Sequence, residues 1–129
     1  MLATEPEFID LTPEMKTRLD HYRDEHKDDP IGNIGGRIIL EDDRVRIWEL
    51  NLEPGEASDL HRHEHDYYLI VMEGDYVAGV CPEGSGVDSF VGKIPEAGNT
   101  ISVPKGGFEW ALNVGDKTYR EFIVELKDT

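Results

Sequence analysis

Three histidines occupy alternate positions, 61, 63 and 65, in a segment that follows a Pro-Gly turn and precedes a run of apolar, β-prone residues. In an extended strand, residues two apart point to the same side. His61 and His63 can therefore direct two imidazoles at one point, as a metal site requires. The chain contains five histidines in total, so this clustering marks the segment as the first candidate site. The alternative is a solvated loop with scattered histidines.

The residues around these histidines predict a series of short strands. From Ile34 onward, runs of apolar and β-branched residues alternate with Gly, Pro, Asp and Asn turns, a pattern typical of an all-β sandwich or barrel. Strands are expected at residues 37–40, 44–52, 59–63, 67–72, 75–80, 90–94, 100–103, 109–113 and 118–127. Three tight turns, at residues 42–43, 73–75 and 114–117, are expected to close hairpins.

The first thirty residues differ from the rest and predict one helix. Thr12 is placed to cap its N-terminus, Pro13 suits the first helical position, and Glu14 lies near the positive end of the helix dipole. An apolar stripe recurs at helical spacing: Met15, Leu19 and Tyr22. The helix should end near Lys27, before an Asp-Asp-Pro sequence. We expect this helix to cover a barrel end or a subunit interface, or to have no functional role.

Composition limits the classes of partner. The 129 residues suit one domain, and 28 acidic against 13 basic residues give a formal net charge of -15. Such a surface repels phosphate backbones and anionic lipid, so we expect neither a nucleic acid nor a membrane as partner. No apolar run is long enough to cross a bilayer, and the N-terminus lacks the pattern of a secretory signal. The single Cys81 cannot form an internal disulfide, which fits a cytoplasmic location, and we interpret it as structural.

The segment 55–74 resembles the first sequence motif of small single-domain cupins, members of the RmlC-like cupin superfamily. In that motif Gly, His-x-His, Glu and Gly recur at fixed spacing. The corresponding residues here are Gly55, His61, His63, Tyr67 and Gly74. Each spacing is kept, but a tyrosine stands where the family has a glutamate.

The segment 98–113 resembles the second cupin motif, in which Gly, Pro-x-Gly, His and Asn recur. The corresponding residues are Gly98, Pro104, Gly106, Glu109 and Asn113. Again the spacing is kept and one ligand position differs, because Glu109 stands where the family has a histidine.

Together the two motifs imply an all-β fold, a double-stranded β-helix (jelly-roll cupin barrel) with an N-terminal helix. The resemblance covers roughly residues 45–126. It implies a division into an N-terminal helical extension, residues 1–33, and a cupin barrel, residues 34–129. Small cupins commonly pair, so the resemblance also implies a homodimer.

The resemblance further implies a divalent metal site with an altered ligand set. The usual ligands are two histidines of the first motif, a glutamate, and a histidine of the second motif, so the set here becomes His61, His63 and Glu109. Two imidazoles and one carboxylate suit non-haem Fe(II), and Zn, Mn or Ni also fit such a set. His65 is a candidate substitute ligand, and either His65 or Tyr67 is a candidate catalytic proton-transfer group. The alternative is a barrel that has lost its metal.

Other residues near this site are placed less directly by the pattern. Arg46 and Trp48 share one face of their strand, and either face of that strand can be the inward one. An inward Arg46 would suit an anionic substrate. Trp110 is expected to point away from Glu109 and to pack, and Asn113 is expected to be structural.

From these features we expect a metal-binding enzyme that acts on a small polar, carboxylate-bearing metabolite, as an oxygenase, an isomerase or a lyase. One alternative is a non-catalytic cupin that binds a small molecule without metal. The string His-Arg-His-Glu-His-Asp-Tyr is also similar to cupins of β-alanine degradation, which would place the protein in small carboxylate catabolism.

Overall fold

The computed structural model describes residues 4–96 and 98–129, and over these residues the chain forms ten strands and one helix. The elements in chain order are β1 (Glu7–Ile9), α1 (Pro13–Glu25), β2 (Arg37–Glu41), β3 (Val45–Leu52), β4 (His61–Arg62), β5 (Tyr67–Glu73), β6 (Tyr76–Val80), β7 (Phe90–Lys93), β8 (Thr100–Val103), β9 (Phe108–Asn113) and β10 (Tyr119–Leu126). The nine strands predicted from the sequence are all confirmed, with ends that differ by at most two residues. Strand β1 is an addition that the pattern did not predict.

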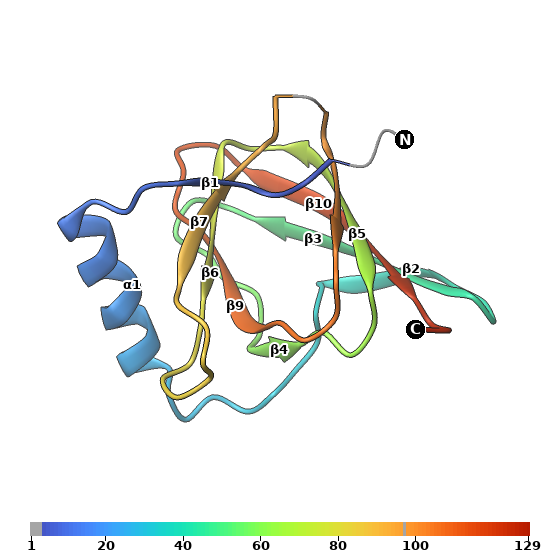
Figure 1. The fold of residues 1–129 in the computed structure, drawn as a ribbon, viewed down its shortest axis with the longest axis horizontal. Coiled ribbons are helices and arrows are strands. Elements are labelled where there is room, and N and C mark those ends of the chain that lie inside the picture. Colours follow the sequence, from blue (N-terminus) through green and yellow to red (C-terminus); the bar gives the residue numbers. More distant parts are fainter. Residues whose placement is uncertain (1–3, 97) are drawn as a thin grey trace.

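The strands form two antiparallel sheets that face each other and enclose the barrel interior (Figure 1). Each sheet has five strands. The sheet with the longer strands, called the larger sheet, has the order β2-β3-β10-β5-β8, and the other, called the smaller sheet, has the order β1-β7-β6-β9-β4. Strands that are consecutive in the chain often lie in different sheets, as in a double-stranded β-helix. The predicted all-β barrel with an N-terminal helix is therefore confirmed.

Only one of the three predicted hairpins is present. The turn at residues 42–43 joins β2 and β3, which pair with each other. The other two hairpins are wrong, because residues 73–75 lead from β5 to β6 and residues 114–117 lead from β9 to β10, each crossing between sheets. Glycine and aspartate specify a chain reversal but not the sheet that the next strand joins. At one of these corners Gly74 has a φ of 123° and lies against Tyr119, where a Cβ would come within 2.8 Å of the ring.

The inward side of the larger sheet is set by alternation along β3 and β10. In β10 every second residue is buried, beginning with Tyr119. In β3, Trp48 and Leu50 belong to the same buried cluster as Tyr119. Glu49 points to the other side, where it lies beneath the guanidinium groups of Arg37 and Arg120, which hold the pKa of its carboxyl below the ordinary value. The inward face of β3 is thus the face that carries Trp48.

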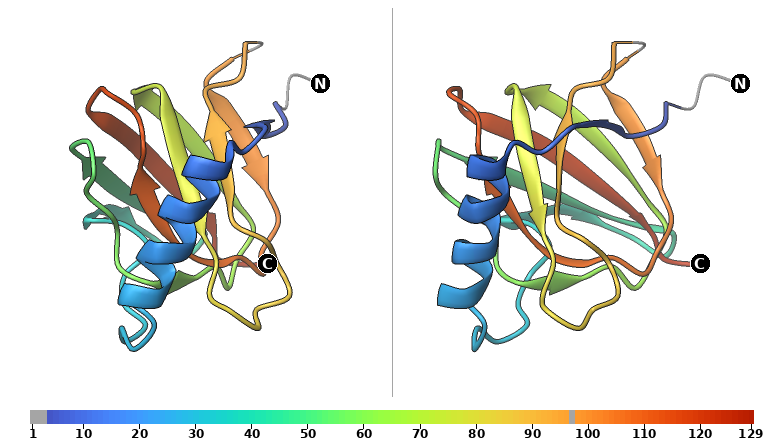
Figure 2. Two further views of the ribbon diagram at one scale, coloured as in Figure 1. Left: turned by 90° about the vertical axis from the view of Figure 1, so that its left-hand side faces the viewer. Right: turned by 60° about the vertical axis from the view of Figure 1, so that its left-hand side comes forward.

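Helix α1 begins as predicted and covers the outer face of the smaller sheet (Figure 2). The hydroxyl of Thr12 accepts a hydrogen bond from the Met15 N–H, and Pro13 is the first helical residue. Leu19 is fully buried among side chains of that outer face: Leu60, Ala78, Val80, Val91, Trp110 and Leu112. The helix therefore packs on a sheet face rather than over a barrel end, and its predicted place at a subunit interface stays a prediction.

The segment before the helix is part of the barrel wall. Strand β1 pairs with β7 in the smaller sheet, while Thr4 bridges to Ile101 and accepts a hydrogen bond from the Ser102 N–H in the larger sheet. This segment therefore closes the seam between the edges of the two sheets. Residues 4–9, which lie inside the predicted extension, contribute directly to the barrel.

The larger sheet has no helix over its outer face among the described residues. Two side chains of β5 on that face, Tyr68 and Met72, are 40% and 48% exposed.

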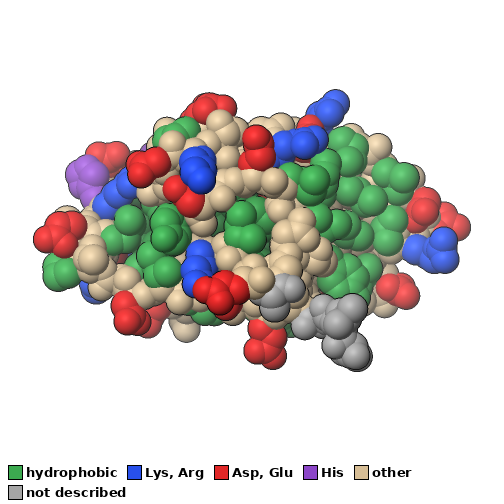
Figure 3. Space-filling view, turned by 90° about the horizontal axis from the view of Figure 1, so that it is seen from above, with side chains coloured by type: hydrophobic (Ala, Val, Ile, Leu, Met, Phe, Trp, Pro, Cys, Tyr) green, Lys and Arg blue, Asp and Glu red, His purple; other side chains and the backbone are tan. Residues whose placement is uncertain are grey.

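Figure 3, which looks at the molecule from above, shows hydrophobic side chains exposed between acidic groups. No helix in the described part of the chain has the length and hydropathy needed to cross a membrane.

The contact between α1 and the smaller sheet can be tested with Leu19→Ala. Removing this fully buried side chain should lower the free energy of unfolding by about 2–5 kcal/mol in a urea titration. Arg18→Ala, at the exposed neighbouring position, is the control and should change stability by less than about 0.5 kcal/mol. Equal effects of the two substitutions would contradict the packing of α1 on the sheet.

Candidate metal centre

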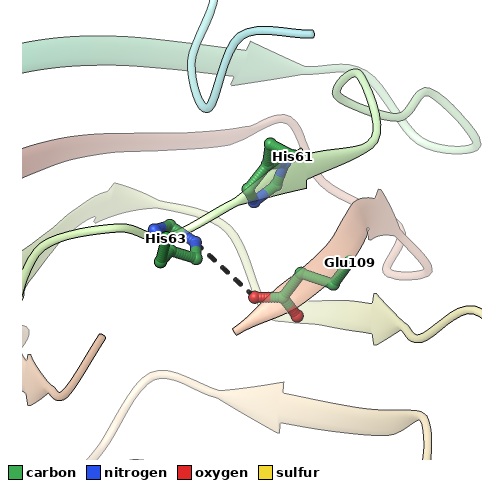
Figure 4. Close-up of side chains that lie close together, drawn as sticks. All are labelled: His61, His63 and Glu109. Carbon is green, nitrogen blue, oxygen red and sulfur yellow. Dashed lines mark ion pairs between the residues drawn. The ribbon is translucent and has the colours of Figure 1, made fainter. Parts of the chain in front are cut away.

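The two motifs meet because β4 pairs with β9. Their antiparallel register sets His61 directly opposite Glu109. His63 lies just beyond the end of β4, where its backbone N–H donates to the Gly107 carbonyl and its carbonyl accepts from the Gly106 N–H. One ligand atom from each of the three side chains lies within 4.8 Å of the others, and the three side chains converge (Figure 4). The structure therefore brings together the three residues that the motifs suggested.

The proton on the His61 ring is positioned by the backbone. Its Nδ1 lies 2.8 Å from the carbonyl oxygen of Asp59 and 3.3 Å from the hydroxyl of Ser58. Because a carbonyl oxygen can only accept, Nδ1 carries the proton and Nε2 keeps its lone pair. Burial also lowers the pKa of this imidazole, which favours the neutral form. His61 is thus held in the tautomer and charge state of a metal ligand.

His63 is a second buried, neutral imidazole. Its Nε2 lies 3.7 Å from Oε1 of Glu109, and its Nδ1 is buried with no hydrogen-bond partner among the described residues. Burial, together with the neighbouring His61, lowers its pKa to about 3. One face of the ring stacks on Tyr67, with centroids 4.0 Å apart and planes 14° apart. This stacking fixes the ring plane.

Glu109 is a carboxyl group whose charge lacks compensation. Burial raises its pKa to about 7. The one basic side chain paired with it among the described residues is His63, and His63 is uncharged in the pH range in which Glu109 ionises. A divalent ion would stabilise the Glu109 carboxylate and would also take the lone pairs of two imidazoles. The donor set therefore fits a divalent ion.

Gly79 provides the space for the Glu109 carboxylate. It lies on β6, beside β9, and a Cβ at this position would collide with Oε2 of Glu109 and with the ring of Phe90. Sequence reasoning did not select Gly79, because a glycine inside a strand pattern does not show which side chain comes close to it.

The three residues form part of the wall of a cavity of about 280 Å³ between the two sheets. Its lining is mostly apolar and includes Leu69, Val71, Val77, Phe90, Ile101 and Ile123. This volume lies near the lower end of the range for small-molecule pockets. The candidate ligands thus adjoin a space suited to a small organic molecule.

Two polar residues of this cavity were missed by sequence reasoning. Tyr119 and Glu121 lie on the inward side of β10, and both are buried. The Tyr119 hydroxyl donates to Oε2 of Glu121 at 3.3 Å. Burial raises the pKa of Glu121 to about 8. The signal that could have identified Glu121 is its position in β10, two residues from Tyr119 and two from Ile123, and Glu125 shares this inward side of the strand.

His65 and Tyr67, the two predicted proton-transfer residues, lie in different environments. Strand β4 ends at Arg62 and the chain bends at residue 65, so the alternation from His61 does not continue. The His65 ring lies 3.4 Å from the Thr129 carbonyl oxygen and does not line the cavity. The structure therefore does not bring His65 to the site, either as a substitute ligand or as a proton-transfer group. Tyr67 does line the cavity, and burial raises its pKa, so its hydroxyl keeps its proton.

Arg46 lies on the inward side of its strand but outside the cavity. Its guanidinium pairs with Glu41 at 3.0 Å and with Glu125 at 3.6 Å. Lys93 is the one basic residue that lines the cavity among the described residues, and it lies 3.9 Å from Glu96. The expected arginine for an anionic substrate is therefore absent from the described lining.

The remaining predictions near the second motif are confirmed. Asn113 is fully buried, and its amide donates to the carbonyls of Leu52 and Lys117, so its role is structural. Trp110 packs beneath α1, away from the cavity.

Cys81 is a buried thiol on the cavity wall, and burial raises its pKa to about 12, which makes it a poor nucleophile.

The raised pKa of Glu121 predicts how stability depends on pH in protein treated with a chelator. Below pH 4.5 the group is protonated in both states. As pH rises to about 8, the unfolded chain ionises first and stability is lost. Glu121→Gln removes this titration, so the variant should gain stability relative to wild type between pH 5 and pH 9, by an amount on the order of 3 kcal/mol.

Urea titrations at the two pH values measure this difference. Ile123→Val is the matched control on the same strand, since it alters cavity packing without a titratable group. Its effect should be equal at both pH values. If the Glu121→Gln effect were also independent of pH, Glu121 would not be a buried titrating group in the folded protein.

Comparisons with known proteins bear on the fold. No family model matches the sequence, and no curated protein matches it. The crystal structure of a cupin domain from Bordetella pertussis Tohama I is similar, with a TM-score of 0.61 and 21% identity over 75% of this chain and 98% of that chain. A protein with a double-stranded β-helix domain from Klebsiella pneumoniae gives a TM-score of 0.54 and 18% identity over 84% and 85% of the two chains.

A third similar structure is the oxalate decarboxylase of Bacillus subtilis, a protein with Mn(II) centres. Its TM-score is 0.54 at 20% identity, over 80% of this chain but only 29% of that chain. At these identities the likenesses show the fold. Together with the two facing antiparallel sheets, they show that this chain is a small cupin by fold, a double-stranded β-helix barrel with one helix near its N-terminus.

Proposed function

We propose that this protein is a metal-dependent enzyme that binds one divalent ion at His61, His63 and Glu109 and a small organic molecule in the adjoining cavity. One observation carries the proposal. The three donor atoms lie within 4.8 Å of one another and belong to side chains that line the cavity between the two sheets. A functional site on this fold has to be argued from such a geometry, because cupin barrels host unrelated chemistries.

The donor set limits the choice of ion. Two neutral imidazoles and one carboxylate suit Fe(II), Mn, Ni or Zn, and three protein ligands leave coordination positions for other groups. The hydrogen bond from His61 Nδ1 to the Asp59 carbonyl is the kind of support that orients a ligating imidazole. The Mn(II) centres of oxalate decarboxylase support Mn as the first ion to test. When bound, such an ion would supply a Lewis acid or activate water or dioxygen.

The other residues of the cavity would bind and orient the substrate. Tyr67 holds the plane of the His63 ring by stacking, and its protonated hydroxyl can donate a hydrogen bond to a substrate oxygen. The apolar walls exclude water from the reacting atoms. The donor set suits an oxygenase, an isomerase or a lyase alike.

The lining also bears on the expected carboxylate-bearing metabolite. Glu109 and Glu121 both line the cavity, and Lys93, the one basic lining residue described, lies beside Glu96. A substrate carboxylate would therefore depend on the metal ion for its charge compensation. We therefore propose carboxylate-bearing substrates only where the carboxylate binds the metal ion. A role in β-alanine or small carboxylate catabolism is consistent with such substrates.

A homodimer and a cytoplasmic location also stay as proposals.

A second candidate function is binding of a small molecule without metal or catalysis. The observation that favours it is the neutral state of the site at moderate pH, since His63 is unprotonated and the pKa of Glu109 is raised to about 7. Such a site is stable without an ion below that pH. The two functions differ in one measurement, the metal content of the purified protein, because only the enzyme requires a bound ion.

Metal content is the direct test of the proposed function. Protein purified without a metal-binding tag should contain close to one Fe, Mn, Ni or Zn per chain by elemental analysis. Glu109→Gln should lower the metal content at least about tenfold, because it removes the anionic ligand without a large change of volume. His65→Ala is the matched control outside the cavity and should retain metal.

A metal content that is the same in Glu109→Gln and wild type would refute this ligand set. No metal in any of the proteins, even after incubation with each ion, would leave the metal-free binding protein as the function. Circular dichroism of each variant shows whether a loss of metal reflects the site or the fold.

Gly79→Ala tests the space that the carboxylate needs. The added methyl group would displace the Glu109 side chain, so affinity for the ion should fall about tenfold or more. Gly84→Ala is the control for a glycine substitution far from the site, since nothing lies within 4 Å of its Cβ position. That control has a positive φ and should lose some stability but keep its affinity for metal, as measured by competition with a chromogenic chelator. Unchanged affinity in Gly79→Ala would show that Glu109 does not bind the ion from this position.

A further inference from the structure

A second acidic group lies in the cavity on the sheet opposite the candidate ligands. Glu121 is in the middle of β10 in the larger sheet, whereas His61 and Glu109 are on β4 and β9 in the smaller sheet. Its side chain lines the cavity and is only 4% exposed. The candidate metal centre described above does not use this residue.

The hydrogen bonding of Glu121 is incomplete within the chain. Among residues 4–96 and 98–129, the one hydrogen bond to its side chain comes from the Tyr119 hydroxyl, at 3.3 Å to Oε2. The other carboxyl oxygen, Oε1, has no partner there. A buried carboxyl group with one oxygen left unpaired is less stable than one with both oxygens hydrogen-bonded, so a donor from the cavity would stabilise it.

The surroundings of Glu121 define the kind of molecule that could supply this donor. Its register partners on the neighbouring strands are Leu50 on β3 and Val71 on β5, and both are apolar. Ile123, the next inward residue of β10, also lines the cavity. A ligand that fits here has an apolar body and one polar end.

We propose that Glu121, oriented by Tyr119, is a recognition subsite for the hydroxyl group of a small, otherwise apolar alcohol or phenol. A hydroxyl can donate to Oε1 and can also accept a hydrogen bond, so it matches the carboxyl group in either protonation state. A ligand carboxylate at this end would be buried without a cationic partner, because Lys93, the one Lys or Arg side chain in the described lining, lies beside Glu96.

The choice of a hydroxyl over an ammonium group rests on the proposed function. A divalent ion at His61, His63 and Glu109 puts positive charge in the same cavity and would repel an ammonium group. Burying a charged group is also less favourable than burying a neutral hydroxyl. The Glu121 subsite itself does not depend on the ion.

Four probes with a phenyl ring and a short alkyl chain test the subsite: 2-phenylethanol, propylbenzene, 2-phenylethylammonium and phenylacetate. Isothermal titration calorimetry gives each Kd with metal-free protein and with Mn(II)-loaded protein. We expect 2-phenylethanol to bind about tenfold more tightly than propylbenzene, which has the same number of non-hydrogen atoms, in both forms. In the Mn(II)-loaded form it should also bind more tightly than the ammonium probe.

Variants at position 121 connect this preference to the residue. Glu121→Leu should abolish the preference for the alcohol, so that the two probes bind with about equal Kd values. Glu121→Gln, whose side chain still donates and accepts hydrogen bonds, should keep a preference within about threefold of the wild-type value. Ile123→Val is the matched control on the same strand and should weaken both probes alike. An apolar residue at position 121 removes a buried acid, so Glu121→Leu should fold, which circular dichroism verifies.

Three results would overturn the proposal: equal affinity for 2-phenylethanol and propylbenzene in wild type, a preference that persists in Glu121→Leu, or no binding of any probe. Tightest binding of the ammonium probe to the Mn(II)-loaded protein would overturn the assignment to a hydroxyl. If the protein binds no metal but the metal-free form shows the preference that depends on Glu121, the proposed function fails while this inference stands.

Discussion

The pairing of β4 with β9 is the contact on which the candidate site depends. Strand β4 has only two residues, yet its register sets His61 opposite Glu109. The pairing is extended on one side by Ser58, which exchanges hydrogen bonds with the backbone of Ala111, and on the other by the backbone of His63. These bonds hold the candidate ligand atoms of two distant motifs within 4.8 Å of one another. A shift by one residue would turn the inward side chains to the other face of the sheet.

The same barrel interior combines a mostly apolar lining with several acidic groups, of which Glu109 and Glu121 lie on opposite sheets. Glu121 is buried and Glu109 is largely buried, and burial raises the pKa of both. Neither faces an arginine, because Arg46 pairs with Glu41 and Glu125 outside the cavity. Groups that are poorly stabilised by the chain itself are the ones that gain most from an ion or a ligand. The unfavourable burial and the proposed binding therefore have one physical origin.

Much of the fold follows from local patterns. Apolar and β-branched runs between turn residues located nine strands, and the cap formed by Thr12 located the start of the helix, because both signals lie within a few neighbouring residues. Strand β1 was missed since three residues carry too little periodicity. The hairpins predicted at the turns 73–75 and 114–117 are wrong, because each turn leads to a strand of the other sheet. A turn sequence specifies a chain reversal, whereas the burial of whole strands decides which sheet each strand joins.

The sequence by itself determined the all-β class, through its short apolar runs and turns, and its resemblance to the two cupin motifs grouped His61, His63 and Glu109, because those motif positions belong to strands that this fold pairs. Only the tertiary structure decided that His65 leaves the site, since a bend at that residue ends the alternation. It alone also showed that Gly79 makes room for a carboxylate and that Glu121 faces the site across the cavity. Those relations join residues on different strands and different sheets, and contacts between separate strands are set by packing rather than by any local pattern.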